Sequence, residues 1–441
     1  MNNNGAFFQA DMETERLYGL YRNSAGVTTD SRAVKKGEIF FALKGPTHDG
    51  NRHALAAIEA GALAAIVDDH SLSGERIIVV DDVLDTMAAL AACHRKRLHM
   101  PVIAVTGTNG KTTTKELLTA VLSRKGRVHS TSGNFNNHIG VPLTLLSAPD
   151  DAAFLVVEMG ANHMGEIAAL CRTAMPSHGI ITNIGTAHIE GFGSFENVRK
   201  AKSELYQWLE ANGGTVILND DNPILSELAR NIDKTVLYSS PGGHRLSVKN
   251  NDGDGMYLRV RAEIDGIAHS FETGLFGSYN IDNLRAAMAA GLFFGVTVKE
   301  IVDAVSSYRP SNNRSQVTET GRNTVIRDAY NANPSSMEKA IASFGRLNAG
   351  KKMVILGDML ELGTESVPGH AAVIRQLRGL GEIKAVLVGP RFREAAGDFP
   401  ASLFESSEAV AEWLKSESPA GYTILVKGSR GIMLEKIFPL L

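Results

Sequence analysis

A glycine-rich segment that ends in a lysine and threonines has the residue types and spacing of a phosphate-binding loop. It follows the apolar run Val102–Val105 and reads Gly107-Thr108-Asn109-Gly110-Lys111-Thr112-Thr113. In such a loop, backbone N–H groups, the helix that follows and the lysine ammonium all bind phosphate oxygens, and the next hydroxyl can reach Mg²⁺. The general pattern has four residues between its glycines, whereas Gly107 and Gly110 have two between them. We predict a shortened phosphate loop; the alternative is a tight turn with a surface lysine.

Two residues beyond apolar runs are candidate metal ligands. Glu158 directly follows the run Phe154–Val157, and His188 lies four residues beyond the run Ile180–Ile184. Ligands gather where the parallel strands of an open α/β sheet end, so we predict that both residues bind metal. The alternatives are a carboxylate at a helix start for Glu158 and a loop histidine for His188.

Lys202 lies inside the apolar stripe of a predicted helix over Ser194–Ala211. At about 100° per residue, this helix has one broad apolar face, formed by Phe195, Val198, Leu205, Trp208 and Leu209. A lysine there either extends along the apolar surface to water or has its amine shifted towards the neutral form by desolvation. A neutral amine close to a metal can react with CO₂ and become a carbamate ligand.

Polar residues also gather in two later segments. Asn280 and Asn283 lie where a helix is predicted to open at Ile281, and Asn280 is a good residue to cap it. Arg314 follows a break in the pattern, and Asp328 ends a strand predicted over Thr324–Arg327. Asn331 and Asn333 come next, before Pro334, which can start a helix. These positions suit either ligand contact or helix capping.

The elements that position these residues change character twice along the chain. Residues 1–99 contain short strands, predicted at Ile39–Leu43, Ala64–Val67 and Ile77–Val80, and a helix at His53–Ala60. Met100-Pro101 then marks a boundary, because a residue before proline disfavours helix. From there, strands and helices alternate, with buried strands predicted at Val102–Val105, Phe154–Val157, Ile180–Ile184 and Val216–Leu218.

A second break, over Arg309–Arg314, precedes another alternation of strands and helices. Its strands are predicted at Thr324–Ile326, Met353–Leu356, Ala385–Val388 and Thr423–Val426. The predicted fold class is therefore α/β with three domains. These are a smaller N-terminal α/β domain (1–99), a central doubly wound nucleotide-binding domain with the phosphate loop (100–312), and a C-terminal Rossmann-like domain (313–441).

Length and composition exclude several functional classes. A chain of 441 residues is too long for a single small binding module, since domains usually have about 100–200 residues. With 45 Lys and Arg against 48 Asp and Glu, the chain has no basic field for nucleic acid. Cys93 and Cys171 form no metal-binding pattern and suit a reducing compartment. We find no signal-peptide pattern and no long apolar stretch, so we expect a cytoplasmic protein without membrane insertion.

The shortened loop resembles that of the Mur ligases, the ATP-dependent amide-forming enzymes of peptidoglycan precursor synthesis. Four further segments resemble, in the same order, the member of this family that adds a dipeptide: Gly133–Leu146, Asp328–Pro334, Leu356–Gly363 and Val426–Arg430. The resemblance runs from Thr28 to the carboxyl terminus. Several spaced motifs in one order are more specific than a single loop.

This resemblance implies substrates and cofactors. ATP and two Mg²⁺ ions would act on UDP-N-acetylmuramoyl-tripeptide, held by the N-terminal domain, and on D-alanyl-D-alanine, brought by the C-terminal domain. The acceptor carboxylate would attack the γ-phosphate of ATP, and the dipeptide amine would then displace phosphate from the acyl phosphate. Either His188 or a metal-bound water would take the amine proton. We expect a monomer.

The resemblance also implies roles for individual residues. Lys111 and the loop around it would bind the ATP phosphates, and Lys111, His188 and Lys202 would form the catalytic group. The remaining roles are metal binding by Thr112, Glu158, His188 and carbamylated Lys202; adenine, ribose and phosphate contacts by Asn280, Asn283, Arg314 and Asp328; uridine contact by Ser31; acceptor contacts by Asn136 and Asn137; and dipeptide contacts by Asn331 and Asn333. For Ser31 the alternative is a turn residue.

Other functions stay open at this point. Another Mur-type ligase that adds a single amino acid, or a folate polyglutamyl ligase, would share most of these residues. A plain ATPase or a nucleotide switch is a different class. It is disfavoured because a switch needs neither a third domain nor a lysine placed for carbamylation.

Overall fold

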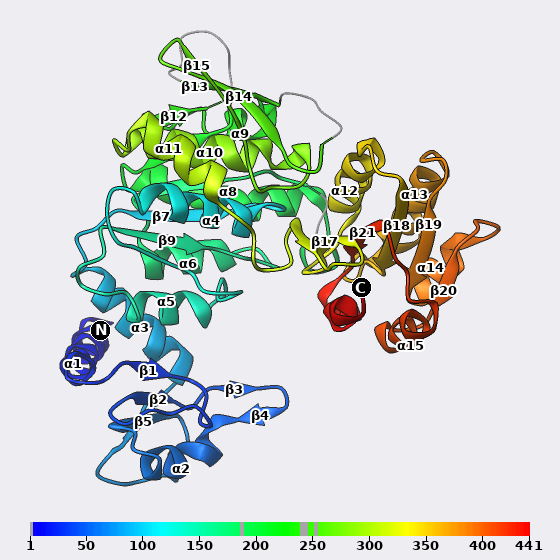
Figure 1. Cartoon of the computed structure of the whole chain (residues 1–441). Helices are drawn as coiled ribbons and strands as arrows, with labels where there is room; N and C mark the ends of the chain where they lie inside the picture. Colours follow the sequence, from blue (N-terminus) through cyan, green and yellow to red (C-terminus); the bar gives the residue numbers. More distant parts are fainter. Residues whose placement is uncertain (1–2, 186–188, 239–245, 251–254) are drawn as a thin grey trace. The chain divides into compact units, whose positions relative to one another are not determined.

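The computed structural model describes residues 3–185, 189–238, 246–250 and 255–441 of the chain (Figure 1). The chain forms two compact units. The first comprises Met1–Ala104, Gly126–Ala161 and Gly165–His178, and the second comprises Val105–Lys125, Asn162–Met164 and Gly179–Leu441.

A small parallel sheet forms the N-terminal part of the first unit. Its strands lie in the order β1 (Val27–Thr28), β2 (Ile39–Phe41), β5 (Ala64–Val67) and β6 (Ile77–Val79), all parallel. Helix α2 (Ala54–Glu59) packs on this sheet through alanines that meet Phe40 and Val67. A two-stranded hairpin, β3 (Lys44–Gly45) with β4 (His48–Asp49), leads into the 3₁₀ turn η1 (Gly50–His53).

The rest of the first unit combines helices with strands that lead to the candidate site. The helices are α1 (Asn3–Arg22), α3 (Val83–Arg95), α5 (Gly140–Leu146) and α6 (Glu166–Ala174). Strands β7 (Val102–Thr106), β9 (Phe154–Glu158) and β8 (Val128–Ser130) are neighbours in that order; the last two residues of β7 belong to the second unit. Every residue of β7 and β9 is buried, as their continuous apolar runs predict.

In the first part of the second unit, strands and helices alternate along the chain. Its helices include α4 (Lys111–Leu122), α7 (Ile189–Phe192), α8 (Phe195–Ala211), α9 (Pro223–Leu228), α10 (Ile281–Phe293) and α11 (Val298–Ser307). Strands β12 (Thr235–Leu237), β11 (Thr215–Leu218) and β10 (His178–Ile181) are neighbours in that order, although His178 itself belongs to the first unit. A separate antiparallel sheet of β13 (Leu246–Asn250), β14 (Arg259–Ile264) and β15 (Ile267–Glu272) was not predicted.

The last part of the second unit is a six-stranded sheet covered on both faces. The strand order is β16 (Gln316–Glu319), β17 (Thr324–Asp328), β21 (Tyr422–Lys427), β18 (Lys351–Gly357), β19 (Lys384–Val388) and β20 (Ser402–Phe404). Only the pair of β16 and β17 is antiparallel.

The two faces of this sheet build two separate cores. Val354 and Leu356 of β18 pack with α12 (Pro334–Arg346), α13 (Ser366–Arg378) and α14 (Pro390–Ala396). Met353 and Ile355 pack with α15 (Ser407–Glu417) and η5 (Leu434–Leu440) on the opposite face, because successive residues of a strand point to opposite sides. The C-terminal elements in Figure 1, from gold to red, form this layered arrangement.

Most predicted elements are confirmed, with some ends moved. The strand predicted over Ile180–Ile184 is wrong in its second half, since β10 ends at Ile181 and the residues after it hold the phosphate loop instead. Helix α3 was not predicted, and its buried face includes His94. No helix within the described ranges is long and apolar enough to cross a membrane.

Candidate active site

Two glycines allow the phosphate loop to take its path between β7 and α4. Gly107 has a φ of 141°, and a Cβ atom there would lie 2.0 Å from Thr182 Oγ1. Gly110 has a φ of 81°, and a Cβ atom there would lie 2.3 Å from Asn283 Oδ1. Both separations are far below van der Waals contact, so the conformation and the space at each position require glycine. The predicted loop between strand and helix is confirmed in its geometry.

The residues that follow β10 hold this loop through neutral side chains. Asn183 accepts the Asn109 N–H at 3.0 Å and donates from Nδ2 to the Asn109 carbonyl at 3.0 Å. Thr182 Oγ1 donates to the same carbonyl at 2.6 Å. Thr108 donates its N–H to the Asn183 carbonyl, and its hydroxyl accepts the Gly185 N–H at 2.9 Å. Both sides of the loop backbone are therefore fixed.

Lys111 is the first residue of α4 and points back over the loop. Its ammonium donates to the carbonyl oxygens of Gly107 and Thr108, at 2.8 and 3.2 Å. Thr112 and Thr113 follow in the first turn and are buried. The first N–H groups of a helix have no acceptor within it, so this turn and the ammonium together suit an anion such as a phosphate.

Glu158 is the last residue of β9, within the first unit, and is 1% exposed. Its Oε1 accepts Asn136 Nδ2 at 2.8 Å, while its Oε2 is buried and has no hydrogen-bond partner in the part of the chain that is described. The alternative for Glu158, a carboxylate at a helix start, is wrong, because this residue ends a strand. A buried carboxylate oxygen with spare lone pairs suits a hard cation such as Mg²⁺, which prefers oxygen ligands.

Asn137 lies next to Asn136, but its side chain bonds to the backbone and not to Glu158. It is exposed, and its Oδ1 accepts the N–H groups of Ile139 and Gly140 at the start of α5, at 3.1 and 2.9 Å. Of the two residues predicted to contact the acceptor, one therefore orients Glu158 and the other supports a helix start.

Lys202 is buried in α8, with 3% of its surface exposed. Its Nζ lies 5.5 Å from the centroid of the Phe192 ring. The alternative in which this lysine extends to water is therefore wrong. The predicted apolar face is confirmed at Val198, Leu205 and Leu209, but Phe195, in the first turn, is 39% exposed. His188 lies outside the described residues.

Asn280 and Asn283 join the phosphate-loop helix through side-chain hydrogen bonds. Thr114 Oγ1 donates to Asn283 Oδ1 at 3.1 Å, and Asn283 Nδ2 donates to Asn280 Oδ1 at 2.9 Å. Asn280 Nδ2 donates to the Phe276 carbonyl at 2.8 Å. Asn280 does precede α10, yet its side chain makes no capping hydrogen bond, so the capping alternative is wrong.

Arg314 and Asp328 lie close to three residues that were given no role. The Arg314 guanidinium carbon lies 3.8 Å from the centroid of the Tyr330 ring, and its buried Nε has no hydrogen-bond partner in the described segments. Asp328 accepts the Ser315 N–H at 3.1 Å and Lys427 Nζ at 2.6 Å. The Lys427 side chain is 3% exposed, so this ion pair is buried.

Asn331 and Asn333 differ in how much of their side chains is already bonded. Asn333 caps α12 by accepting the Ser336 N–H at 2.9 Å, and its Nδ2 donates to Asn109 Oδ1 at 2.8 Å. Asn331 is exposed, and its Oδ1 accepts the neighbouring Ala332 N–H at 2.8 Å.

Ser31 lies half-exposed in the turn that follows β1, within the first unit. The turn is held by Asp30, whose carboxylate accepts the Arg32 N–H at 3.0 Å and two guanidinium hydrogen bonds at 2.9 Å. These bonds to Arg32 lower the pKa of the Asp30 carboxyl to about 2. The structure places Ser31 in a turn, which was the alternative for this residue.

Within the second unit, hydrogen bonds connect Asn283, Asn280 and Asp328 of the predicted nucleotide residues to the helix that follows the phosphate loop. The chain of hydrogen bonds runs from Thr114 through Asn283 and Asn280 to Ser315, with a contact of 3.5 Å between Asn280 Nδ2 and Ser315 Oγ. Ser315 then reaches Asp328. Ser31, Asn136, Asn137 and Glu158 belong to the first unit.

Sequence reasoning missed three kinds of site residue. Lys427 carried a usable signal, because it directly follows an apolar run in the same way as Glu158. Thr182 and Asn183 were taken as part of the strand predicted over Ile180–Ile184. Ser335, whose Oγ accepts Asn109 Nδ2 at 2.9 Å, carried no local signal.

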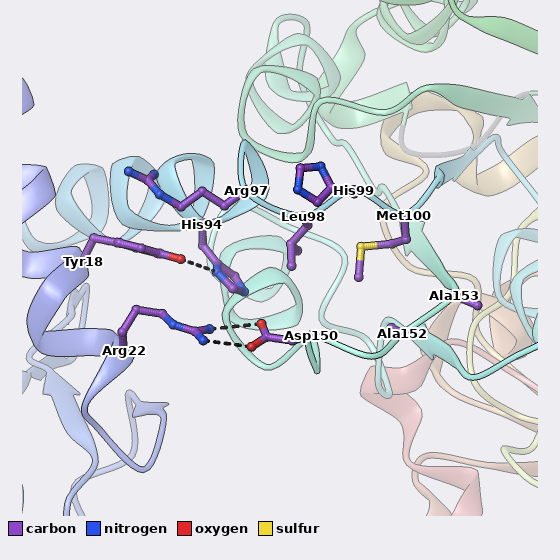
Figure 2. A pocket seen from close by; sticks show the side chains of 10 residues that line it. All are labelled: Tyr18, Arg22, His94, Arg97, Leu98, His99, Met100, Asp150, Ala152 and Ala153. Carbon is purple, nitrogen blue, oxygen red and sulfur yellow. Dashed lines mark hydrogen bonds and ion pairs between the residues drawn. The ribbon is translucent and has the colours of Figure 1, made fainter.

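A polar pocket in the first unit was also not predicted (Figure 2). It has a volume of about 530 Å³ and is lined by residues of α1, of α3 and the segment after it, and of the segment that follows α5. Arg22 donates two hydrogen bonds to Asp150, at 3.0 and 2.8 Å, and Tyr18 lies 3.4 Å from His94 Nδ1. Burial, with a contribution from Arg22, lowers the pKa of His94. Neither Lys111 nor Lys202 lines this pocket.

Comparisons with known proteins agree over nearly the whole chain. Three family models match in succession: "Mur ligase family, catalytic domain" over residues 23–104, "Mur ligase middle domain" over 105–291 and "Mur ligase, glutamate ligase domain" over 313–430. The UDP-N-acetylmuramoyl-tripeptide–D-alanyl-D-alanine ligase of Bacillus subtilis (strain 168) is 35% identical over 426 residues, 93% of this chain and 92% of that protein.

Solved structures give the same result. MurF ligase from Thermotoga maritima in complex with ADP superposes with a TM-score of 0.85 at 28% identity, over 96% of this chain and 97% of that one. MurF from Acinetobacter baumannii superposes with a TM-score of 0.84 at 29% identity, over 95% and 97%.

Proposed function

The chain belongs to the Mur ligase family, and we propose that it joins D-alanyl-D-alanine to UDP-N-acetylmuramoyl-tripeptide in peptidoglycan precursor synthesis. It is an ATP-dependent ligase. The observation that carries the proposal is the phosphate loop, in which two positions require glycine and the Lys111 ammonium lies over the loop carbonyls. Asn109 of this loop is bonded to Asn333, and Thr114 of the helix that follows is bonded to Asn283. The B. subtilis relative, matched over nearly its full length, supports the choice of substrates.

The reaction needs activation of the acceptor because a carboxylate is a poor electrophile. Its oxygen attacks the γ-phosphorus of ATP; an oxygen–phosphorus bond forms, and the bond to ADP breaks. The dipeptide amine then attacks the carbonyl carbon, a carbon–nitrogen bond forms, and phosphate leaves with the electron pair of the broken carbon–oxygen bond. Lys111 and the first turn of α4 stabilise charge on the transferred phosphoryl group, which is where phosphoryl-transfer catalysis mostly lies. No covalent enzyme intermediate is needed.

Mg²⁺ is the proposed metal cofactor, in two copies. The fit rests on Glu158, whose Oε1 is fixed by Asn136 while its buried Oε2 keeps its lone pairs. Thr112, His188 and carbamylated Lys202 are the other proposed ligands. When bound, Mg²⁺ would neutralise phosphate charge. Burial of Lys202 supports its proposed conversion, because an amine removed from water is more readily neutral.

The remaining assignments are proposals of the same kind. The three domains would comprise residues 1–99, 100–312 and 313–441. Ser31, Asn136 and Asn137 would lie on the acceptor side, and Asn331 and Asn333 on the dipeptide side. Asn280, Asn283, Arg314 and Asp328 would position the adenine, ribose and phosphates of ATP. We propose a cytoplasmic monomer that binds no nucleic acid and does not insert into membranes.

Phosphate release measured with ATP, UDP-N-acetylmuramoyl-tripeptide and a panel of amines tests this function. D-alanyl-D-alanine should stimulate release, whereas meso-diaminopimelate, lysine and glutamate should not. Stimulation by a single amino acid alone would assign the chain to another Mur-type activity or to folate polyglutamylation. Hydrolysis that ignores every acceptor and amine would contradict a ligase. Lys111→Ala is the matched control for background phosphate.

A further inference from the structure

The side chain of Asn109, in the phosphate loop, is bonded to the start of α12. Its Nδ2 donates to Ser335 Oγ at 2.9 Å, and its Oδ1 accepts Asn333 Nδ2 at 2.8 Å. Ser335 Oγ in turn donates to Asn333 Oδ1 at 3.0 Å. Three side chains thus form a closed ring of hydrogen bonds between residues more than two hundred positions apart in the sequence.

Both ends of this ring are held rigidly. On the loop side, the N–H and the carbonyl of Asn109 are bonded to Thr182 and Asn183, so the backbone that carries the carboxamide is fixed. On the helix side, Asn333 and Ser336 form a reciprocal capping box, in which each side chain accepts the other's backbone N–H at 3.1 Å or less. The ring therefore joins two ordered segments.

The direction of the Asn109 side chain gives it a different role from the rest of the loop. Both polar atoms of its carboxamide are bonded to the segment Asn333–Ser335, and its backbone N–H is bonded to Asn183. Lys111 and the first turn of α4 provide the groups that suit phosphate. Asn109 is thus the residue of the loop that faces the proposed dipeptide side.

We propose that Asn109 is a positioning residue, which holds the first turn of α12 in place against the ordered phosphate loop and so couples the ATP side of the reaction to binding of the dipeptide amine. The inference rests on the proposed function, in which Asn331 and Asn333 lie on the dipeptide side. It adds a role for the loop that phosphate binding alone does not require.

Asn109→Ala tests the proposal through a difference between two ligands. The ratio kcat/KM for D-alanyl-D-alanine should fall roughly tenfold to a hundredfold, as expected for the loss of two hydrogen bonds. The Kd for ADP, measured by calorimetry, should change far less. Ser335→Ala should give a smaller effect in the same direction and serves if the loop variant is poorly folded. The double variant should lose less than the sum of the two, because both substitutions break one ring.

Hydrogen exchange of the wild type and Asn109→Ala gives a readout that needs no turnover. Amides at the start of α12 should exchange faster in the variant. Asn212→Ala is the matched control, since this exposed asparagine donates only locally, to the Trp208 carbonyl at 2.8 Å, and it should behave as wild type. An Asn109→Ala protein with unchanged dipeptide kinetics, with an equal loss of ADP affinity, or with effects additive to Ser335→Ala would overturn the inference. A wild-type protein that D-alanyl-D-alanine does not stimulate would instead contradict the proposed function.

Discussion

Replacing Lys427 by methionine tests the buried ion pair where β17 and β21 end. Lys427 Nζ lies 2.6 Å from Asp328 Oδ2, and the two side chains are 3% and 14% exposed. Methionine keeps most of the apolar stem but leaves the Asp328 carboxylate with the Ser315 N–H as a neutral partner. Removing one member of a buried pair costs about 3–5 kcal/mol of unfolding free energy, because it leaves an uncompensated charge. Since Asp328 keeps one hydrogen bond and some exposure, we expect about 3 kcal/mol.

The loss can be measured by urea unfolding of this part of the chain. The protein has two tryptophans, so in a Trp208→Phe background the emission of Trp413, on α15, reports the C-terminal core. A loss of that size should lower the urea midpoint by roughly 1–3 M, given typical slopes of about 1–3 kcal/mol per M. Lys415→Met is the matched control: its pair with Glu412, at 2.7 Å, is 57% and 73% exposed and should contribute less than about 1 kcal/mol.

Adding Asp328→Asn to Lys427→Met tests whether the unpaired carboxylate causes the loss of stability. If the unpaired carboxylate is responsible, the double variant should recover part of the stability, because the buried charge is gone. Equal midpoints for Lys427→Met and Lys415→Met would refute the reasoning, and so would a double variant that is less stable than Lys427→Met.

Three further predictions concern Lys202, Gly110 and His370. Lys202→Ala should lose most ligase activity and regain part of it with added formate or acetate, since the buried amine would act as a carbamate; full activity in the variant would reduce Lys202 to a packing residue. Gly110→Ala should raise the KM for ATP, because its Cβ would lie 2.3 Å from Asn283 Oδ1, and Asn283→Ala in the same protein should relieve part of the defect if that clash is the cause. His370 is a buried residue of α13, and its Nε2 accepts the Met359 N–H at 3.0 Å. Burial lowers the pKa of His370, so the folded protein binds fewer protons than the unfolded chain below the ordinary histidine pKa of about 6.5. Urea midpoints should therefore fall as the pH drops below that value, and an equally steep fall in His370→Gln would show that another group is responsible.

The strands and the phosphate loop were predictable because their signals are local. A continuous apolar run such as Phe154–Val157 can only be a strand or helix with all sides buried, and its shortness favours a strand. Pro334 and Asn333 specify the start of α12 within a few residues, through a fixed φ and a side-chain cap. The antiparallel sheet of β13–β15 was missed although β14 alternates between exposed and buried residues, since its alternating residues include Arg259 and Glu263 and read as a polar loop.

The surroundings of a site residue were predictable where they depend only on its position along one helix or strand. Helical periodicity alone put Lys202 among apolar residues, and it is buried there. Periodicity failed at Phe195, which lies in the first turn of α8 and is 39% exposed. The contact of Asn109 with Asn333 could not be predicted from the sequence, because no local pattern in either segment indicates a partner 224 residues away.

The residues that hold the phosphate loop are neutral, and the charge of the expected ligands explains why. Amides and hydroxyls of Asn183, Thr182 and Asn283 fix the loop and the start of its helix, and these groups add no net charge there. A carboxylate in any of these places would repel ATP, and an ammonium would compete with Lys111 for the phosphates. Local cations can then act on anionic substrates even though the chain as a whole has a net charge of −3. The abundance of asparagine and threonine around the loop is therefore an electrostatic requirement of its function as much as a matter of backbone support.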